Sequence, residues 1–289
     1  MKYDFNTIKM KGKVQIDIDK WLRFDNSAIE VRRLNGKLVP TGICRACSIG
    51  EGVVGIRGGD LILISKTACD VATTPYVSYT VDGRRYFNIP AEQVVGLFQG
   101  KVDIKNLKMC KNYLLFKRIE KRQDSVLYIE EKDTMLGEVI QVSSKSLFQL
   151  GDIIAIRDNV STPIKDGYYA VEEKFVVGKL ENGLSIKNMR ILNNYVLANP
   201  YIPPKVLNSK ILETARIDYD NLDYTDINNR NLFKVIYSDS SLKSVKPGDI
   251  ILADRNFANY MYYENEKYFI LEGIESISGK IIERDKICN

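Results

Sequence analysis

The feature that most constrains this chain is a short phrase that occurs three times. A Gly-Asp pair opens an aliphatic run at residues 59–64, again at 151–156 and again at 248–253. Each copy is followed by a turn and an aromatic-led stretch, at 86–89, 168–171 and 268–271. Self-similarity at a nearly constant spacing is typical of tandem copies of one structural unit. The 289 residues are therefore expected to fold as three small modules.

A second repeat predicts where the modules join. Residues 94–96, 104–108 and 112–115 read Val-Val-Gly, Ile-Lys-Asn-Leu-Lys and Asn-Tyr-Leu-Leu, and closely similar residues stand at 176–178, 186–190 and 194–197. A closing strand, a linker and an opening strand are thus copied together. The predicted domains are residues 1–104, 105–187 and 188–289, and short linkers of matched length predict similar relative orientations.

The residue pattern within each module indicates strands. Short bursts of Ile, Val, Tyr and Phe favour β structure, and Asp82-Gly83 between two such bursts predicts a tight hairpin. Further strands are predicted at 42–49, 137–142 and 232–237, with a helical turn at 90–93. With roughly five to seven short strands per module and little helix, the expected fold is mainly β, as three tandem small barrels.

Two regions fall outside the repeat. Residues 1–22 form an N-terminal arm before the first module, in which 13–19 alternates between polar and apolar residues like an edge strand. A polar stretch near 216–231, rich in aspartate and asparagine, predicts an acidic insertion loop in the third module.

Composition removes several classes of chemistry. The chain has no histidine, which excludes imidazole bases, Ser-His-Asp and Cys-His nucleophilic sites, and histidine metal ligands. Five scattered cysteines are poor material for a disulfide framework. No apolar run approaches the ~20 residues that span a bilayer, and Met1 leads into charged residues rather than a signal region. The expected location is the cytoplasm or a particle assembled there, without a membrane partner.

Three local motifs have ordinary structural readings. Residues 50–55 fit G-x-G-x-x-G, but a strand rather than a helix follows, so we interpret them as a turn and not as a nucleotide site. Cys44 and Cys47 have metal-ligand spacing, but residues three apart in a strand point to opposite faces, which favours buried small hydrophobes. The aspartates of 218–226 lack the central glycine and final glutamate of a calcium loop. No metal or cofactor is expected.

The 17 tyrosines raise the possibility of stacked nucleic-acid bases. They recur at the same strand positions in all three modules, which is what packing within a sheet predicts. A net charge of +5 over the whole chain also falls short of a groove that follows a phosphate backbone. Nucleic-acid binding stays a minor alternative.

Taken as a whole, each module resembles the co-chaperonin (GroES-like) family. In the second module, residues 112–118 are similar to the opening strand, 126–128 to the aliphatic triplet of the mobile loop, and 137–142 to the Gly-Glu-Val strand. The Gly-Asp strand at 151–155, Tyr169 and the closing pair at 176–177 follow in order. The first module matches mainly from 42 to 97, and the third at 194–197 and 232–279. The resemblance implies three GroES-like barrels and points to Val126, Leu127 and Tyr128 as possible partner-binding residues.

The sequence also differs from that family in ways that argue against a co-chaperonin function. Only residues 122–125 separate the opening strand from the triplet, the other modules show no convincing triplet, and co-chaperonin subunits carry a single module. The zinc ligands and nucleotide domain of dehydrogenases that share the GroES-like domain are lacking.

The bias towards Lys, Ile, Asn and Tyr resembles AT-rich bacteriophage proteins. We therefore expect a non-enzymatic virion component, an auxiliary capsid-decorating protein that contacts a major capsid or connector protein and takes no small-molecule substrate. The alternatives are a co-chaperonin that binds a chaperonin and a nucleic-acid-binding array of barrels. An enzyme that uses carboxylates alone is the reading we set aside.

Overall fold

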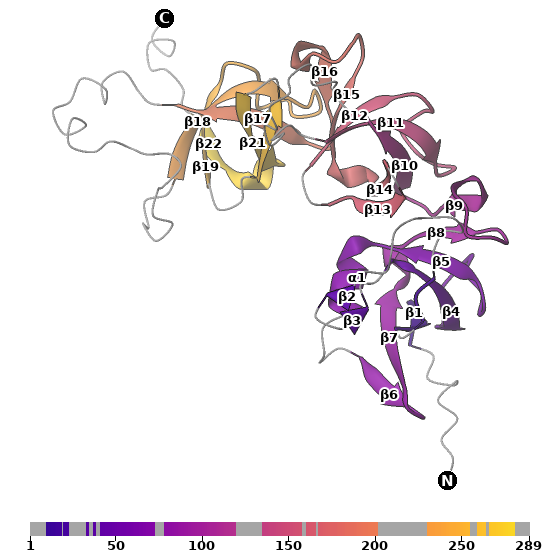
Figure 1. Ribbon diagram of the computed structural model, residues 1–289. Coiled ribbons are helices and arrows are strands. Elements are labelled where there is room, and N and C mark those ends of the chain that lie inside the picture. The colour runs from indigo at the N-terminus through magenta and orange to yellow at the C-terminus, as the bar shows by residue number, and fades with distance from the viewer. Residues whose placement is uncertain are drawn as a thin grey trace, which may run out of the picture. The chain divides into compact units, whose positions relative to one another are not determined.

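A computed structural model gives the fold (Figure 1). It describes residues 10–18, 20–22, 33–34, 37–38, 41–72, 78–119, 135–157, 160–165, 167–201, 230–254, 259–263 and 266–280. The chain divides into two compact units. The first comprises Met1–Lys121, Leu136–Ile153 and Asn159–Phe175, and the second comprises Arg122–Met135, Ile154–Asp158 and Val176–Asn289.

The first sheet has seven antiparallel strands in the order β6-β7-β1-β4-β5-β8-β9. Its strands are β1 (Lys13–Asp17), β4 (Ile43–Ile49), β5 (Leu61–Ile64), β6 (Tyr79–Val81), β7 (Arg84–Pro90), β8 (Val94–Phe98) and β9 (Leu107–Met109). A short helix α1 (Lys66–Ala72) follows β5, and β2 (Arg33–Leu34) pairs with β3 (Lys37–Leu38). Single turns of 3-10 helix lie at η2 (Ala91–Gln93) and η3 (Ile104–Asn106).

The second and third sheets repeat this order. The second runs β13-β14-β10-β11-β12-β15-β16 and the third runs β20-β21-β17-β18-β19-β22. The second consists of β10 (Tyr113–Arg118), β11 (Met135–Val142), β12 (Ile153–Ile156), β13 (Thr162–Lys165), β14 (Tyr168–Glu172), β15 (Val176–Leu180) and β16 (Met189–Ile191), with η4 (Glu173–Phe175) and η5 (Ile186–Asn188). The third consists of β17 (Tyr195–Pro200), β18 (Arg230–Ser238), β19 (Ile250–Asp254), β20 (Asn259–Tyr263), β21 (Glu266–Glu272) and β22 (Ile277–Lys280), with η7 (Ile274–Ser276).

The prediction of a mainly β chain with three repeated sheets is confirmed. In each sheet the opening strand lies between the aromatic-led strand and the strand that precedes Gly-Asp, as in β7-β1-β4. The hairpin at Asp82-Gly83 is also confirmed, since both residues have the positive φ of a type I′ turn (47° and 77°). These strand orders have two ends each, so closure into barrels stays a prediction, as do the three domain boundaries.

The prediction of an edge strand within the N-terminal arm is wrong. Strand β1 pairs with β4 on one side and with β7 on the other, so it is an interior strand of the first sheet. Its apolar residues Val14 and Ile16 are fully buried. Residues 13–17 are the opening strand of the first module, equivalent to β10 and β17, and alternation alone could not reveal the two neighbours.

Each compact unit has its own hydrophobic core. Within the first unit, one cluster fills the first sheet around Ile16, Ile62 and Ile64, with α1 contributing Ala68 and Cys69. Within the second unit, a cluster fills the third sheet, and its members are Val196, Ala198, Phe233, Val235, Leu242, Val245, Ile251, Ala253, Phe269 and Leu271.

Candidate interaction surfaces

The Gly-Asp phrase is part of the framework and not a binding site. In each copy the glycine has positive φ, between 84° and 92°, which a residue with a side chain rarely adopts. The Asp side chain accepts a hydrogen bond from the backbone N–H three residues earlier. The donors are Arg57 to Asp60 at 2.7 Å, Gln149 to Asp152 at 2.9 Å and Lys246 to Asp249 at 2.7 Å.

The backbone of the same pair closes around one residue of the neighbouring strand. In the first sheet, Gly59 N–H donates to the Ala46 carbonyl, and Ala46 N–H donates to the Asp60 carbonyl. Gly151 and Asp152 bracket Val139 in the same way, and Gly248 and Asp249 bracket Val235. Each bracketed residue adjoins a register shift, a β-bulge between the strand and the opening strand. The repeated phrase therefore fixes a bulge three times.

A second framework contact recurs where each opening strand begins. Gly12, Asn112 and Asn194 have positive φ (69°, 68° and 60°). Their carbonyls accept hydrogen bonds from the backbone N–H groups of Ala91, Glu173 and Gly273. Asparagine tolerates this conformation better than most residues with a side chain, which explains its place in the repeated Asn-Tyr motif.

The predicted partner-binding residues Val126, Leu127 and Tyr128 lie outside the described residues, as do the predicted acidic loop and its aspartates. What the structure shows are the strands on either side of the triplet. Strand β10 ends at Arg118, β11 begins at Met135, and the two strands pair antiparallel.

Within the first unit, the first and second sheets share a hydrophobic cluster. The first sheet contributes Ile43, Leu63, Val95, Phe98, Leu107 and Met109, and the second sheet contributes Tyr113, Leu115, Ile164 and Ala170. Polar contacts border this cluster: the Lys66 N–H donates to Thr162 Oγ1 at 2.9 Å, and the Tyr113 hydroxyl donates to the Glu92 carbonyl at 3.1 Å. Burial, followed by the charge of Glu172, raises the pKa of Tyr113 above its usual range. This tyrosine therefore stays a hydrogen-bond donor at ordinary pH.

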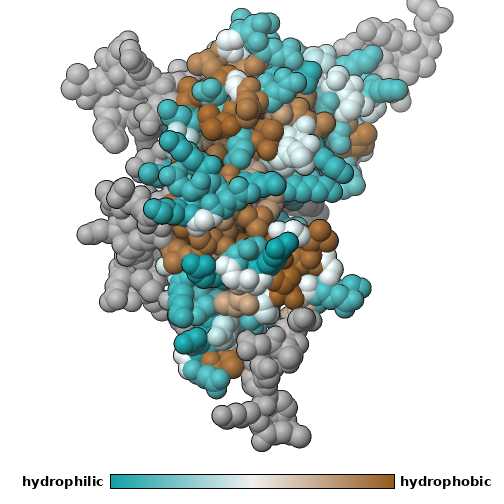
Figure 2. Space-filling model, turned by 90° about the vertical axis from the view of Figure 1, so that its right-hand side faces the viewer, coloured by the Kyte–Doolittle hydropathy of each residue, from teal (hydrophilic) through white to brown (hydrophobic). Residues whose placement is uncertain are grey.

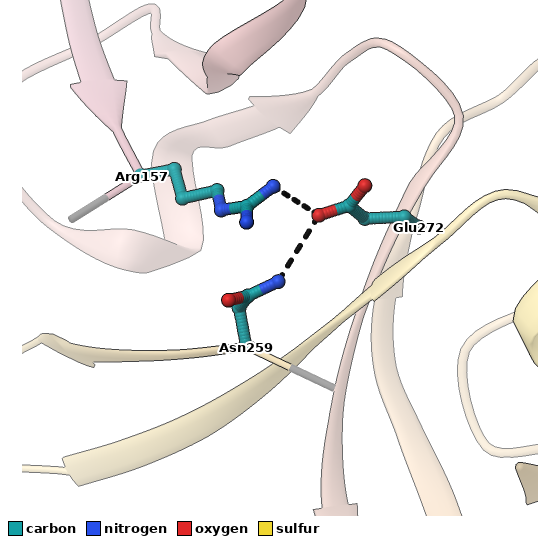
Figure 3. A network of polar contacts seen from close by, with 3 residues as sticks. All are labelled: Arg157, Asn259 and Glu272. Atoms are coloured by element: carbon teal, nitrogen blue, oxygen red, sulfur yellow. Dashed lines mark hydrogen bonds and ion pairs between the residues drawn. The ribbon is translucent and has the colours of Figure 1, made fainter. Parts of the chain in front are cut away.

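Within the second unit, a polar network joins three strand ends (Figure 3). Arg157, directly after β12, forms an ion pair with Glu272 at the end of β21. Asn259, the first residue of β20, donates to the same carboxylate oxygen of Glu272 at 3.0 Å. Arg157 also hydrogen-bonds the hydroxyl of Tyr195, whose pKa is raised by burial and by Glu272. The hydroxyl of Tyr263, the last residue of β20, donates to the backbone carbonyl of Leu184, which lies shortly before η5.

The first sheet differs from the other two on the face of its opening strand. By register, Gln15 of β1 occupies the position of Leu115 in β10 and Leu197 in β17. Its amide donates to the Tyr79 hydroxyl at 2.5 Å, and that hydroxyl lies 3.3 Å from Asn88 Oδ1. At this position the second sheet has Leu115, which packs in the cluster shared with the first sheet, whereas the first sheet has a polar network.

The third sheet carries an aromatic cluster that the other sheets lack at the equivalent positions. Tyr260 and Tyr262 of β20 form an edge-to-face pair with ring centroids 5.7 Å apart. The Lys267 ammonium lies 4.8 Å and 5.9 Å from those two rings and 5.6 Å from the ring of Phe269. The sequence pattern predicts that the tyrosines are packing residues, but Tyr260 is 49% exposed.

Exposed aliphatic side chains gather at the turns that precede Gly-Asp in the first two sheets. Val54 is 91% exposed, Leu147 is 87% exposed and Leu150 is 67% exposed. On the face drawn in Figure 2, hydrophobic residues form several patches that hydrophilic side chains separate. Exposed apolar residues of this kind are candidates for contact with other proteins.

The cysteines of the described residues differ in burial. Cys44 and Cys69 are buried, whereas Cys47 is exposed because side chains alternate between the two faces of β4 from Cys44 to Cys47. The interpretation of both residues of the Cys-x-x-Cys motif as buried is therefore wrong for Cys47. Burial raises the pKa of the Cys69 thiol to about 12 and that of Cys110 to about 11, so these thiols stay protonated.

Among the described residues, no group of three or more acidic, cysteine or histidine side chains is placed to hold a metal ion. The described part of the chain also contains no helix long and apolar enough to cross a membrane.

No protein-family model matches this sequence, and no curated protein matches it significantly.

Proposed function

We propose that this chain is a non-enzymatic structural component of a large assembly, an auxiliary, capsid-decorating protein of a phage virion built from three tandem GroES-like barrels. The observation that supports the proposal is the structural role of the aspartate in each of the three Gly-Asp pairs. Asp60, Asp152 and Asp249 each hydrogen-bond a backbone N–H of their own turn. The chain's most regular polar groups thus maintain its framework, as a building protein requires.

The shared cluster of the first unit supports the same proposal. A module of about 90 residues buries a thin core by itself, and packing one module on the next enlarges it. In the first unit, ten buried residues from two sheets do this. A protein built from repeated modules presents several similar surfaces to its neighbours, and modest contacts then add through avidity.

Mass spectrometry of purified phage particles tests the proposal. We expect the chain at a fixed ratio to the major capsid protein, retained after washing with high salt. Its absence from the particles, or a ratio that varies between preparations, contradicts a structural role.

A second candidate function is that of a co-chaperonin. The observation that favours it is topological: residues 119–134 connect β10 to β11, the opening strand to the Gly-Glu strand. This is where the GroES-like resemblance places the mobile loop, and it contains Val126, Leu127 and Tyr128.

Binding to a purified chaperonin ring tests this candidate. The wild-type chain should bind and Val126→Asp should not, if the triplet is the anchor. Val71→Asp is the matched control, because it places the same charge at another exposed valine, on α1 and outside the candidate surfaces. Failure of the wild-type chain to bind removes the candidate.

A further inference from the structure

In the described part of the chain, the third sheet has one strand fewer than the other two. The first sheet ends with β8 paired to β9, and the second ends with β15 paired to β16. Strand β22 is the equivalent of β8 and β15, since all three pair with the strand that follows Gly-Asp. It stands last in its sheet, so among the described strands nothing pairs with its outer edge.

A glycine at the same position in all three strands shows how that edge differs. Gly96 of β8 and Gly178 of β15 are buried. A Cβ on Gly96 would lie 2.7 Å from Leu107 Cδ1 in β9. A Cβ on Gly178 would lie 2.7 Å from Met189 Cγ in β16. Around Gly279 of β22, which is only half-buried, no described atom lies within 4 Å of that position. The third sheet thus keeps the glycine that admits a neighbouring strand, and among the described residues the space beside it is open.

The burial of the whole strand agrees with an open edge. Residues 94–96 of β8 and 176–178 of β15 are buried. In β22, residues 277–280 alternate between half-buried and exposed. The charge of Lys280 does not prevent pairing, because β15 carries Lys179 at the equivalent position and pairs with β16.

The strands that cover β8 and β15 share a sequence pattern. Asparagine, an apolar residue, a basic residue and a second apolar residue stand at 106–109 and at 188–191. Ahead of β1 the same pattern stands at 6–10, as Asn-Thr-Ile-Lys-Met, with one added threonine. Its last residue, Met10, is 44% exposed, whereas Met109 in β9 is buried. The pattern of a covering strand thus precedes the first sheet, and the third sheet lacks such a strand among the described ones.

The residues directly after β22 match a different part of the repeat. Ile-Cys-Asn at 287–289 follows Gly279 at the spacing at which Ile-Lys-Asn at 104–106 and 186–188 follows the glycines of β8 and β15. In those two copies this triplet is the 3-10 turn η3 or η5, and the covering strand comes after it. Residues 281–289 therefore resemble the connection and not the covering strand, which favours a second copy as the source of the strand.

We propose that copies of this chain associate head to tail, with residues 8–10 of one copy added as a strand along the outer edge of β22 of another. The register follows that of β16 with β15, so Met10 faces Gly279 and Lys9 faces Lys280. Backbone hydrogen bonds across the new pair supply the affinity, and the lack of a Cβ at Gly279 lets the two backbones approach.

The proposed contact is heterologous, because it joins different surfaces of the two copies, so association continues beyond a dimer into rings or filaments. It should also be weak. The hydrophobic cluster that joins the first two sheets includes Val95 and Leu115. By register, Ser278 and Gln15 occupy the equivalent positions at the proposed contact. The inference goes beyond the proposed function, since it applies to an assembly of any kind.

Sedimentation velocity over a concentration series up to the solubility limit tests the inference. We expect the wild-type sedimentation coefficient to rise with concentration. Gly279→Val should weaken association about tenfold or more, because its side chain fills the space of the added strand. The same change should leave the third sheet itself intact, since no described atom lies within 4 Å of the added Cβ and valine favours strands.

Ser278→Val is the matched control. It adds the same residue to the same strand on the opposite face, at the position where β8 and β15 carry valine. It should leave association undiminished, and circular dichroism should show that every variant stays folded. Association that Gly279→Val leaves intact, or that Ser278→Val weakens equally, overturns the inference, as does a wild-type chain that stays a monomer at every concentration.

Mixing two blocked variants tests the direction of the contact. Ile8→Asp should block the donor segment and Gly279→Val the acceptor edge, so each variant alone should stay a monomer at concentrations where the wild-type chain associates. Their mixture should form a 1:1 dimer and nothing larger, because a single contact per pair remains. A mixture that stays monomeric, or Ile8→Asp chains that associate like wild type, overturns the assignment of residues 8–10 as the added strand.

Discussion

At the scale of single residues, the aspartate of each Gly-Asp pair is best understood as a turn-forming acceptor. In the second sheet, Asp152 accepts from the Gln149 N–H through its side chain, and its backbone brackets Val139. The backbone groups of Asp152 thus hold the bulge, and its side chain holds the turn. Its removal should therefore lower stability and leave the strand pairing in place.

Asp152→Ala should reduce the free energy of unfolding by about 1 kcal/mol, the usual net value of one such hydrogen bond. Asp152→Asn keeps an acceptor oxygen and should lose less. Urea denaturation of the wild-type chain and both variants measures the difference. Equal losses in the two variants would mean that charge, and not the hydrogen bond, matters at this position.

The third copy adds a pH dependence. Burial pulls the pKa of Asp249 upward, but hydrogen bonds from Lys280 and from the Lys246 N–H outweigh burial and lower the pKa below its ordinary value of 3.8. The Lys280 Nζ lies 2.7 Å from the Asp249 carboxylate. A carboxyl with a lowered folded pKa contributes stability above the unfolded pKa, and this stability is lost as pH falls through the folded pKa.

Wild type should therefore exceed Asp249→Asn in unfolding free energy above pH 3.8, and the difference should shrink as the pH falls below that value. Unfolding followed by fluorescence at a series of pH values provides the measurement. Lys280→Gln should remove part of the dependence. A difference that grows at low pH contradicts the assigned direction of the shift.

At the scale of strands and sheets, much of the architecture could be predicted from sequence, because the signals were local. The Asp82-Gly83 turn needs positive φ at both positions, and the dipeptide shows this directly. Strands 43–49 and 135–142 begin within two residues of their predicted starts. The role of residues 13–17 could not be predicted, because two neighbouring strands bury Val14 and Ile16 and neither neighbour is visible in a local pattern.

The candidate surfaces were harder still to predict. Tyr260 and Tyr113 look alike in sequence, but one is 49% exposed and the other is 6% exposed. Cys47 and Cys44 lie on opposite faces of β4, as their spacing indicates, but only the structure shows that the face of Cys47 is exposed. The sequence shows that Gln15 is polar. Only the strand register shows that Leu115 and Leu197 occupy the equivalent position in the other two sheets.

The shared cluster of the first unit predicts that truncating a leucine inside it lowers the free energy of unfolding far more than truncating an exposed leucine. Leu115 is 1% exposed and packs in the cluster built from the first and second sheets. Leu115→Ala should therefore cost about 2–5 kcal/mol, the range for a buried leucine. Leu147→Ala, at a side chain 87% exposed, should stay within about 0.5 kcal/mol. Denaturant unfolding of both variants decides, and similar costs would argue against a shared core.

The network of the second unit should contribute modestly. The Arg157 and Glu272 side chains are 22% and 44% exposed, so water screens their attraction. A double-mutant cycle with Arg157→Ala and Glu272→Ala should give a coupling of at most about 1 kcal/mol, and the coupling should fall as salt is added. A coupling that is large and insensitive to salt would show that the pair is more deeply buried than its exposure indicates.

At the scale of the whole molecule, one framework is built three times, and the three sheets differ from one another at a few surface positions. The Gly-Asp bulges and the turns before the opening strands are the same in all three sheets. The departures are the polar face at Gln15, the network at Arg157 and the aromatic cluster at Tyr260. Functions of this chain should therefore follow from the departures, because the repeated residues are already engaged in the fold.

Hydrogen–deuterium exchange on the full chain tests the central claim, that three equivalent frameworks exist side by side in the sequence. The amides of Ala46, Val139 and Val235 each donate to the carbonyl of a Gly-Asp aspartate. The account predicts slow exchange at all three, with loss of protection at one of them when the adjacent glycine, Gly59, Gly151 or Gly248, is replaced. Free exchange at one of these amides in the native chain, with protection at the other two, would contradict it.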